Sequence, residues 1–179
     1  ACSSKNMGVA GANVVILRKD LLDYIKNINH YIPSILDWKL YINTNSLYNT
    51  PAIFNLYLFD YIINDYIKKY KTIEQLSNYN QNKAELLYDF FDTNNNFNLN
   101  VKNKLARSNI NIPFIVENGN KDVHSDFLKH CYENNLVGLR TLTPFNYEEN
   151  NIIEPLRISL YNGVSINQTK KIIKILKSF

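Results

Sequence analysis

Ser-Ser-Lys-Asn-Met-Gly-Val-Ala-Gly at residues 3–11, continued by Ala-Asn-Val-Val-Ile-Leu-Arg at residues 12–18, is the stretch that decides the fold class. A short continuous apolar run that follows Gly8 and Gly11 is typical of a strand buried on both faces of a sheet. Residues 20–28, directly after it, predict a short helix. A buried strand followed by a helix indicates an α/β layer at the start of the chain.

The next segment predicts an irregular region followed by a long helix. Residues 29–50 contain Pro, Trp and many Asn, which favour irregular backbone with one short strand pair. Thr50 as N-cap and Pro51 at the first helical position predict a helix that runs to about residue 70. We therefore expect a boundary between two domains inside this helix, near residue 66.

After residue 70 the pattern predicts helices packed on a small sheet. Thr72 and Gln75 stand in capping-box spacing, and their helix directs five side chains toward a core: Leu76, Tyr79, Leu86, Leu87 and Phe90. Apolar residues alternate at 109–116, which predicts a strand. The same reasoning predicts strands at 137–142 and 156–161 and helices at 122–134 and 165–179. This order indicates an α+β layer.

Composition and charge exclude several classes of protein. The chain has 179 residues, of which 45% are hydrophobic, so it can form a core and is not disordered. The formal charge of +4 is small, and the densest basic cluster consists of Lys170, Lys171, Lys174 and Lys177. A nucleic-acid patch there is one interpretation, but solvated positions on an amphipathic helix are the better one. No nucleic-acid partner is predicted.

Cysteine usage and hydropathy give the expected compartment. Cys2 and Cys131 have neither paired spacing nor a nearby His, so we expect reduced thiols in a cytoplasmic protein and no metal site. The longest apolar stretch, residues 53–67, is interrupted by Asn and Asp, so it predicts no membrane span. The chain starts inside a loop without Met, which suggests a fragment that lacks an N-terminal part.

The residues around Lys5 decide how this lysine is interpreted. A single lysine in a glycine-bearing loop is usually a surface charge. Phosphoserine aminotransferases, however, carry Gln-Lys-Asn-hydrophobe-Gly-x-Ala-Gly, then an apolar strand that ends in Val-Arg-x-Asp-Leu-Leu, and residues 5–22 resemble this pattern. Further stretches resemble the same family in the same order: residues 33–37, 46–51, 83–88, 107–114, 136–139 and 157–162. Such collinearity is more specific than any single motif.

The resemblance implies a fold and an activity. It implies the fold-type I architecture of pyridoxal-phosphate-dependent transferases, with residues 1–66 ending the large cofactor-binding domain and residues 67–179 forming the small C-terminal α+β domain. The implied reaction moves an amino group between phosphoserine and 2-oxoglutarate, in serine and pyridoxine biosynthesis. The substrates would be small amino acids and 2-oxo acids, and the fragment alone would be incomplete as a catalyst.

The resemblance also assigns site residues. Lys5 would bind pyridoxal phosphate covalently. Ser4 replaces the family's Gln, which helps hold the cofactor phosphate, and the Ser4 hydroxyl would still donate one hydrogen bond to that phosphate. Asn49 and Thr50 would bind the cofactor phosphate of a neighbouring subunit, which implies a homodimer. Independently, their place before a helix favours phosphate, although Thr50 could instead only cap the helix. Arg157 would bind the substrate α-carboxylate, since a planar guanidinium suits that group.

One stretch departs from the family pattern. The family has Lys-Gly-His-Arg-Ser-Val-Gly-Gly before the Arg157 position, and its His-Arg pair binds the substrate phosphate. Here Arg140 replaces the Lys, and a longer acidic segment, residues 141–154, contains no His-Arg pair. Two alternatives therefore stay open: a pyridoxal-phosphate transaminase with an altered substrate, or a noncatalytic α+β binding module.

Overall fold

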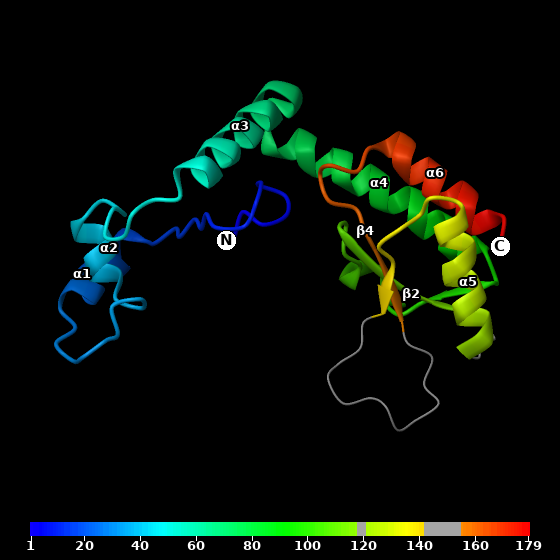
Figure 1. Ribbon diagram of the computed structural model, residues 1–179, viewed down its shortest axis with the longest axis horizontal. Helices are drawn as coiled ribbons and strands as arrows, with labels where there is room; N and C mark the ends of the chain where they lie inside the picture. Colours follow the sequence, from blue (N-terminus) through cyan, green and yellow to red (C-terminus); the bar gives the residue numbers. More distant parts are fainter. Residues whose placement is uncertain (118–120, 142–154) are drawn as a thin grey trace. The chain divides into compact units, whose positions relative to one another are not determined.

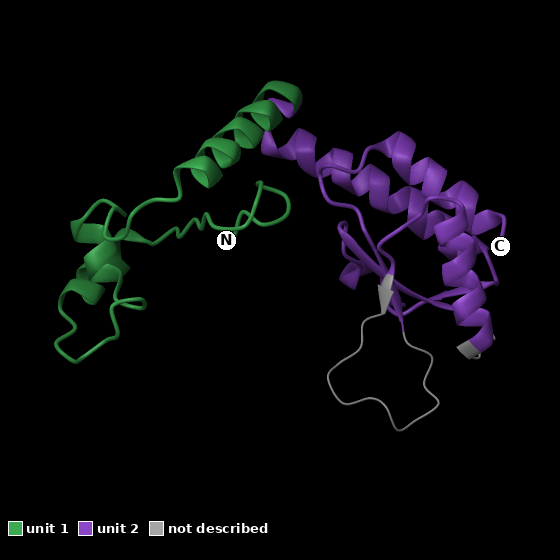
Figure 2. Ribbon diagram, in the orientation of Figure 1, with its two compact units in different colours: residues 1–69 green, residues 70–179 purple. Residues whose placement is uncertain are grey.

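The computed structural model describes residues 1–117, 121–141 and 155–179, which form two compact units, residues 1–69 and 70–179 (Figures 1 and 2). The first unit contains the helices α1 (Lys19–Lys26), α2 (Trp38–Asn43) and most of α3 (Ile53–Tyr70). Helix α1 confirms the prediction for residues 20–28. Within the described residues, none of the helices is both long and apolar enough to cross a membrane.

The predicted buried strand at residues 12–18 was wrong. Only an isolated antiparallel bridge between Cys2 and Asn13 forms there, and the Ile16 side chain is 91% exposed. The backbone of 14–18 is not part of any sheet. A strand buried on both faces needs neighbouring strands and covering helices, and the described part of the chain supplies no strand beside this segment.

The predicted strand pair within residues 29–50 was also wrong, because a short helix forms there. The Asp37 carboxylate accepts a hydrogen bond of 3.0 Å from the Lys39 N–H and thereby caps α2. The aromatic rings of Trp38 and Tyr41 lie 5.8 Å apart, and Tyr41 contacts Tyr48 at 5.9 Å. Local capping and ring contacts stabilise helical backbone at a place where the composition favoured irregular structure.

Helix α3 begins later than predicted. Its first residue is Ile53, and the Ala52 carbonyl accepts a helical hydrogen bond of 3.0 Å from the Leu56 N–H. Thr50 and Pro51 therefore precede the helix, and the prediction that they are its N-cap and first residue was wrong. Thr50 is exposed, so water can hydrogen-bond its hydroxyl without any helical partner.

The second unit is a four-stranded antiparallel sheet covered by helices (Figure 1). The strands run in the order β1-β2-β4-β3. Its elements, in chain order, are α4 (Ile73–Thr93), β1 (Phe97–Leu99), the 3-10 helix η1 (Lys104–Ala106), β2 (Asn111–Val116), α5 (Lys121–Glu133), β3 (Arg140–Thr141), β4 (Leu156–Ser159) and α6 (Ile166–Lys177). The predicted helices at 122–134 and 165–179 and the predicted strands at 109–116 and 156–161 are confirmed, within a few residues at their ends. Of the strand predicted at 137–142, only Arg140 and Thr141 form a strand among the described residues, and residue 142 lies outside them. The sequence did not predict β1 and η1.

Capping residues define where the helices of this unit start. Thr72 accepts a hydrogen bond of 3.2 Å from the Gln75 N–H at the start of α4. Ser165 and Gln168 form a complete capping box at the start of α6. Both predicted starts are confirmed. Each cap accepts a hydrogen bond from a backbone N–H of the first helical turn, which has no partner within the helix.

The core of this unit lies between the sheet and its helices. Strand β2 alternates, with Ile112, Phe114 and Val116 buried on one face. Phe91 stacks on Phe114, with ring centroids 4.9 Å apart. The other buried apolar side chains of the cluster come mainly from α4, β1, α5, β4 and α6: Ala84, Leu87, Tyr88, Phe90, Phe97, Leu99, Phe127, Cys131, Leu156, Ile158, Leu160 and Leu176. The lysines of α6 are exposed, as predicted for a solvated helix face.

Candidate functional site

Lys5 lies in a closed loop at the start of the chain. Residues 1–3 run antiparallel to residues 12–14, joined by hydrogen bonds from the Ser3 N–H to the Ala12 carbonyl (3.0 Å) and from the Val14 N–H to the Ala1 carbonyl (2.8 Å). Lys5 is exposed in the turn between these arms. The geometry therefore places the lysine in the exposed turn of a closed loop.

Two glycines shape this loop. Gly8 has φ of +132° and Gly11 has φ of +114°, conformations that residues with a side chain rarely adopt. A Cβ at Gly11 would also come within 2.5 Å of the Asn55 Nδ2 atom, and a Cβ at Gly8 would lie 3.5 Å from the Ile62 Cδ1 atom. Both glycines of the family-like motif are thus favoured by their backbone conformation, and at Gly11 the close approach of Asn55 also leaves no room for a side chain.

Helix α3 holds the loop through a side chain. Asn55 donates a hydrogen bond from its side-chain amide to the Ala10 carbonyl. Inside the loop, the Ser3 hydroxyl donates to the neighbouring Val9 carbonyl at 2.5 Å, and Ser3 is only 1% exposed. These two donors fix adjacent peptide groups between the two glycines.

Ser4, the predicted phosphate donor beside Lys5, is exposed and shares a hydrogen bond with Cys2. The Cys2 thiol donates to the Ser4 hydroxyl at 3.1 Å. Hydrogen bonds with the Ser4 side chain, and then with its backbone N–H, lower the pKa of Cys2 below its usual value, because they stabilise the thiolate. The Ser4 hydroxyl therefore already takes part in a polar contact at the loop.

Asn49 and Thr50 lie in the same unit as Lys5, in the exposed segment before α3. The nearest helix start is Ile53, so neither residue caps α3. Both residues are exposed, and an amide and a hydroxyl are groups that can donate hydrogen bonds to an anion.

Arg157 lies in the second unit, on strand β4. Leu156 and Ile158 face the core, so Arg157 is half-buried on the opposite face of the sheet. Its Cα pairs with Pro113 on β2 and with Arg140 on β3. The acidic segment of residues 142–154, between β3 and β4, lies outside the described residues. The structure thus brings Ser4 and Lys5 onto one loop, while Arg157 belongs to the other unit.

A buried lysine that the sequence did not single out holds the end of β4. Lys83 of α4 is fully buried, and its ammonium donates to the carbonyls of Leu160 (3.2 Å), Tyr161 (3.1 Å) and Val164 (3.0 Å). It also lies over the Tyr79 ring, 5.2 Å from the centroid. The spacing contained the signal, because Lys83 stands four residues from both Tyr79 and Leu87 on the buried face of α4.

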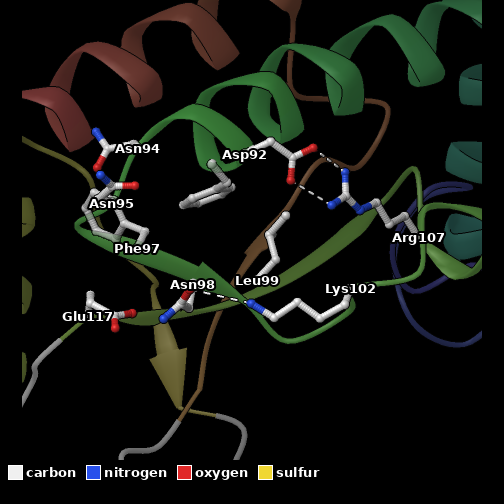
Figure 3. Close-up of a pocket in the computed structure, with 10 residues that line it drawn as sticks. Asp92, Asn94, Asn95, Phe97, Asn98, Leu99, Lys102, Arg107 and Glu117 are labelled. Atoms are coloured by element: carbon white, nitrogen blue, oxygen red, sulfur yellow. Dashed lines mark hydrogen bonds and ion pairs between the residues drawn. The ribbon is translucent and has the colours of Figure 1, made fainter.

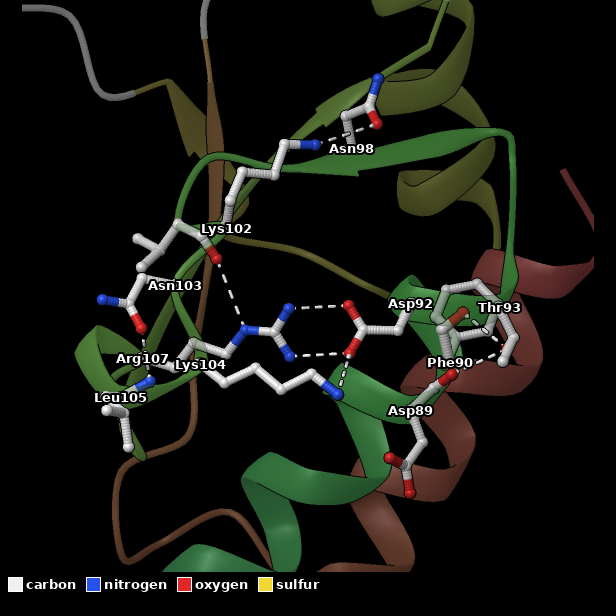
Figure 4. A network of polar contacts seen from close by, with 11 residues as sticks. Asp89, Phe90, Asp92, Thr93, Asn98, Lys102, Asn103, Lys104, Leu105 and Arg107 are labelled. Carbon is white, nitrogen blue, oxygen red and sulfur yellow. Dashed lines mark hydrogen bonds and ion pairs between the residues drawn. The ribbon is translucent and has the colours of Figure 1, made fainter.

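A polar hollow of about 380 Å³ opens at the other end of α4 (Figure 3). Arg107 makes a two-pronged contact with Asp92 on one side of this hollow, and Lys102 reaches the Asn98 side chain at 3.5 Å on the other (Figures 3 and 4). Asp92 and Arg107 are thus paired with each other, and Lys102 contacts a neutral amide. This arrangement fits a structural network better than a ligand site.

Comparisons with known proteins find relatives along the whole chain. No protein-family model matches the chain. The phosphoserine aminotransferase of Buchnera aphidicola subsp. Baizongia pistaciae is 35% identical over 179 residues, which cover 100% of this chain and 44% of that protein. Phosphoserine aminotransferase 2, chloroplastic, of Arabidopsis thaliana is 30% identical and covers 100% of this chain and 39% of that protein. The chain spans less than half the length of these curated relatives.

Solved structures of phosphoserine aminotransferases also resemble this chain along nearly its whole length. The crystal structure of phosphoserine aminotransferase from Trichomonas vaginalis with bound pyridoxal phosphate has a TM-score of 0.80 and 27% identity, covering 98% of this chain and 46% of that one. The fold is therefore that of the C-terminal part of a fold-type I pyridoxal-phosphate-dependent transferase. Within this class, the chain is homologous over its whole length to the C-terminal half of phosphoserine aminotransferases.

Proposed function

We propose that this chain forms the C-terminal half of a pyridoxal-phosphate-dependent aminotransferase that acts on phosphoserine and 2-oxoglutarate. The observation that carries the proposal is the correspondence with phosphoserine aminotransferases along the entire chain. By the complete enzyme we mean this chain together with the part that corresponds to the first half of its relatives. We further propose that residues 1–66 end its large domain and that residues 67–179 form its small domain.

The residues of the Lys5 loop fit the cofactor chemically. Pyridoxal phosphate needs an amine within reach of its aldehyde and neutral donors for its phosphate. Lys5 supplies an exposed amine, and Ser4, Asn49 and Thr50 supply exposed hydroxyl and amide donors. When bound, the cofactor supplies an electron sink for the α-carbon of the amino acid.

The chain's own residues would then perform three tasks. The Lys5 Nζ atom would hold the cofactor, and its free amine would take a proton from the α-carbon of the amino donor and later give one to the α-carbon of the 2-oxo acceptor. Ser4, Asn49 and Thr50 donate hydrogen bonds to the phosphate. Arg157 binds the substrate α-carboxylate with two parallel N–H donors, which orients the amino group for transfer.

Assembly and location follow from the same proposal. We propose a homodimer in which Asn49 and Thr50 reach the cofactor of the neighbouring subunit. We also propose a cytoplasmic enzyme. The homodimer rests on the resemblance and on the exposed position of both residues before α3. The location is supported by two free cysteines, which are usual in a reducing compartment.

The test is a transamination assay with the complete enzyme. Amino transfer from phosphoserine to 2-oxoglutarate is measured beside transfer from serine and from alanine. We expect amino transfer from phosphoserine. The ratio of kcat/KM for phosphoserine to kcat/KM for serine should be smaller than in an enzyme that has the His-Arg pair. One charge-assisted hydrogen bond to a phosphate contributes about 1.5–3 kcal/mol, or roughly one to two decades in binding. Transfer from serine or alanine alone would favour the altered-substrate alternative, and no transfer from any donor would contradict the proposal.

A further inference from the structure

We propose that Asn55 is a positioning residue that fixes the loop carrying Lys5. This inference rests on the proposed function, in which Lys5 binds the cofactor. The loop tip contains two glycines with positive φ, so its peptide groups can rotate more easily than those of ordinary residues. A lysine that must reach one atom of a cofactor needs a loop with one conformation.

Two side chains select that conformation. Ser3, which is buried within the loop, donates to the Val9 carbonyl, and Asn55 of α3 donates to the next carbonyl, Ala10. Both carbonyls lie between Gly8 and Gly11, where the backbone is least constrained. The Ser3 hydrogen bond joins two parts of the loop, whereas the Asn55 hydrogen bond joins the loop to α3.

The contact surface supports this role for α3. The face of α3 that approaches the loop contains Asn55, Phe59 and Ile62, which stand at helical spacing and are all half-buried. A Cβ at Gly8 would lie 3.7 Å from the Phe59 backbone, so the loop packs closely on this face. Within this face, Asn55 supplies the polar contact and therefore sets the register of the loop along the helix.

The position of Asn55 has a consequence for the cofactor site. Asn55 lies in the first turn of α3, five residues after Thr50, which stands in the segment before the helix. The residue that orients the Lys5 loop is thus close in the chain to the segment proposed to bind phosphate in the neighbouring subunit. A shift at the start of α3 would reach the Lys5 loop through the Asn55 hydrogen bond and through the packing of the loop on Phe59 and Ile62.

The test compares Asn55→Ala and Asn55→Asp with Asn64→Ala in the complete enzyme. Asp keeps the shape of Asn but cannot donate when ionised. Asn64 is the matched control, because it is exposed on the same helix and its side chain donates to the Asp60 carbonyl at 2.9 Å. Hydrogen exchange of residues 1–14 is measured without cofactor, and release of pyridoxal phosphate on dilution is measured with it.

We expect both Asn55 variants to raise hydrogen exchange of the loop and cofactor release about fivefold, the factor for one ordinary hydrogen bond. Asn64→Ala should match the wild type in both. Loop exchange equal to the wild type in both Asn55 variants would overturn the proposal. Faster exchange with unchanged cofactor release would overturn the role toward Lys5. A wild-type enzyme that binds no cofactor would instead refute the proposed function, while the exchange measurement would still decide whether Asn55 fixes the loop.

Discussion

Arg107 and Asp92 form a two-pronged ion pair that joins the end of α4 to the segment after η1. The guanidinium donates two hydrogen bonds of 2.7 Å to the two carboxylate oxygens. The same guanidinium lies over the Tyr88 ring, 4.7 Å from its centroid, and the Tyr88 hydroxyl donates to the Ser108 carbonyl at 2.8 Å. The pair therefore fixes the connection that leads into β2.

Replacing Asp92 with Asn should lower the free energy of unfolding by about 1 kcal/mol at pH 7, because a bidentate ion pair contributes more to stability than an ordinary surface pair. The Arg107 hydrogen bonds lower the pKa of Asp92. The pair thus stabilises the fold above the unfolded pKa of about 3.9, and this stability is lost as pH falls through the lower folded pKa. Chemical denaturation from pH 7 to pH 2 measures the effect.

The control for this variant is Asp89→Asn, an exposed position one turn earlier on α4. It should change the free energy of unfolding by less than about 0.5 kcal/mol at every pH. A loss in Asp92→Asn that does not shrink toward acid would contradict the ion-pair explanation and point to packing instead.

Replacing Lys83 with Met should destabilise the second unit by about 3 kcal/mol. The variant removes the donor shared by the carbonyls of Leu160, Tyr161 and Val164. The Tyr161 carbonyl still accepts from the Val164 N–H at 2.8 Å, so the cost comes mainly from the Leu160 and Val164 carbonyls, which lose this partner. Urea denaturation measures the loss. Lys171→Met, at an exposed position of α6, is the matched control and should stay within about 0.5 kcal/mol of the wild type. Equal stability of the two variants would show that Lys83 does not hold the end of β4.

Replacing Arg157 with Met in the complete enzyme should raise the KM for the amino-acid substrate by about one to two decades, because a charge-assisted pair with the α-carboxylate is lost. Arg18→Met is the control, since Arg18 is exposed and pairs only with Asp20 on the surface in the described structure. Steady-state kinetics measure both variants. An unchanged KM for Arg157→Met would remove this residue from the substrate site.

The sequence predicted the second unit well because its elements carry local signals. Caps at Thr72 and Ser165 and the alternation at residues 109–116 depend only on nearby residues, and the structure reproduces them. Strand β1 was missed because Phe97–Leu99 is too short to show an alternating pattern. Its residues gain strand structure from pairing with β2, which is a long-range contact.

The first unit was predicted less well, for a physical reason. Residues 12–18 have the composition of a buried strand, yet burial depends on neighbouring strands that the described chain does not provide. The positive φ of Gly8 and Gly11 was not predicted, because the sequence analysis used these glycines only to mark the start of the apolar run. Nothing in the sequence pointed to Asn55, because its contact with Ala10 joins residues 45 positions apart.

The central claim is that Lys5 is the lysine that binds the cofactor. The most direct measurement is reduction of the complete enzyme with borohydride in the presence of pyridoxal phosphate, followed by peptide mass spectrometry. Reduction makes the bond between cofactor and amine permanent, so the mass spectrum shows which lysine carries the cofactor. We predict one labelled peptide, carrying the modification on Lys5, and no such label in Lys5→Ala. A label on another lysine, or an unlabelled Lys5 in an enzyme that holds the cofactor, would contradict the account.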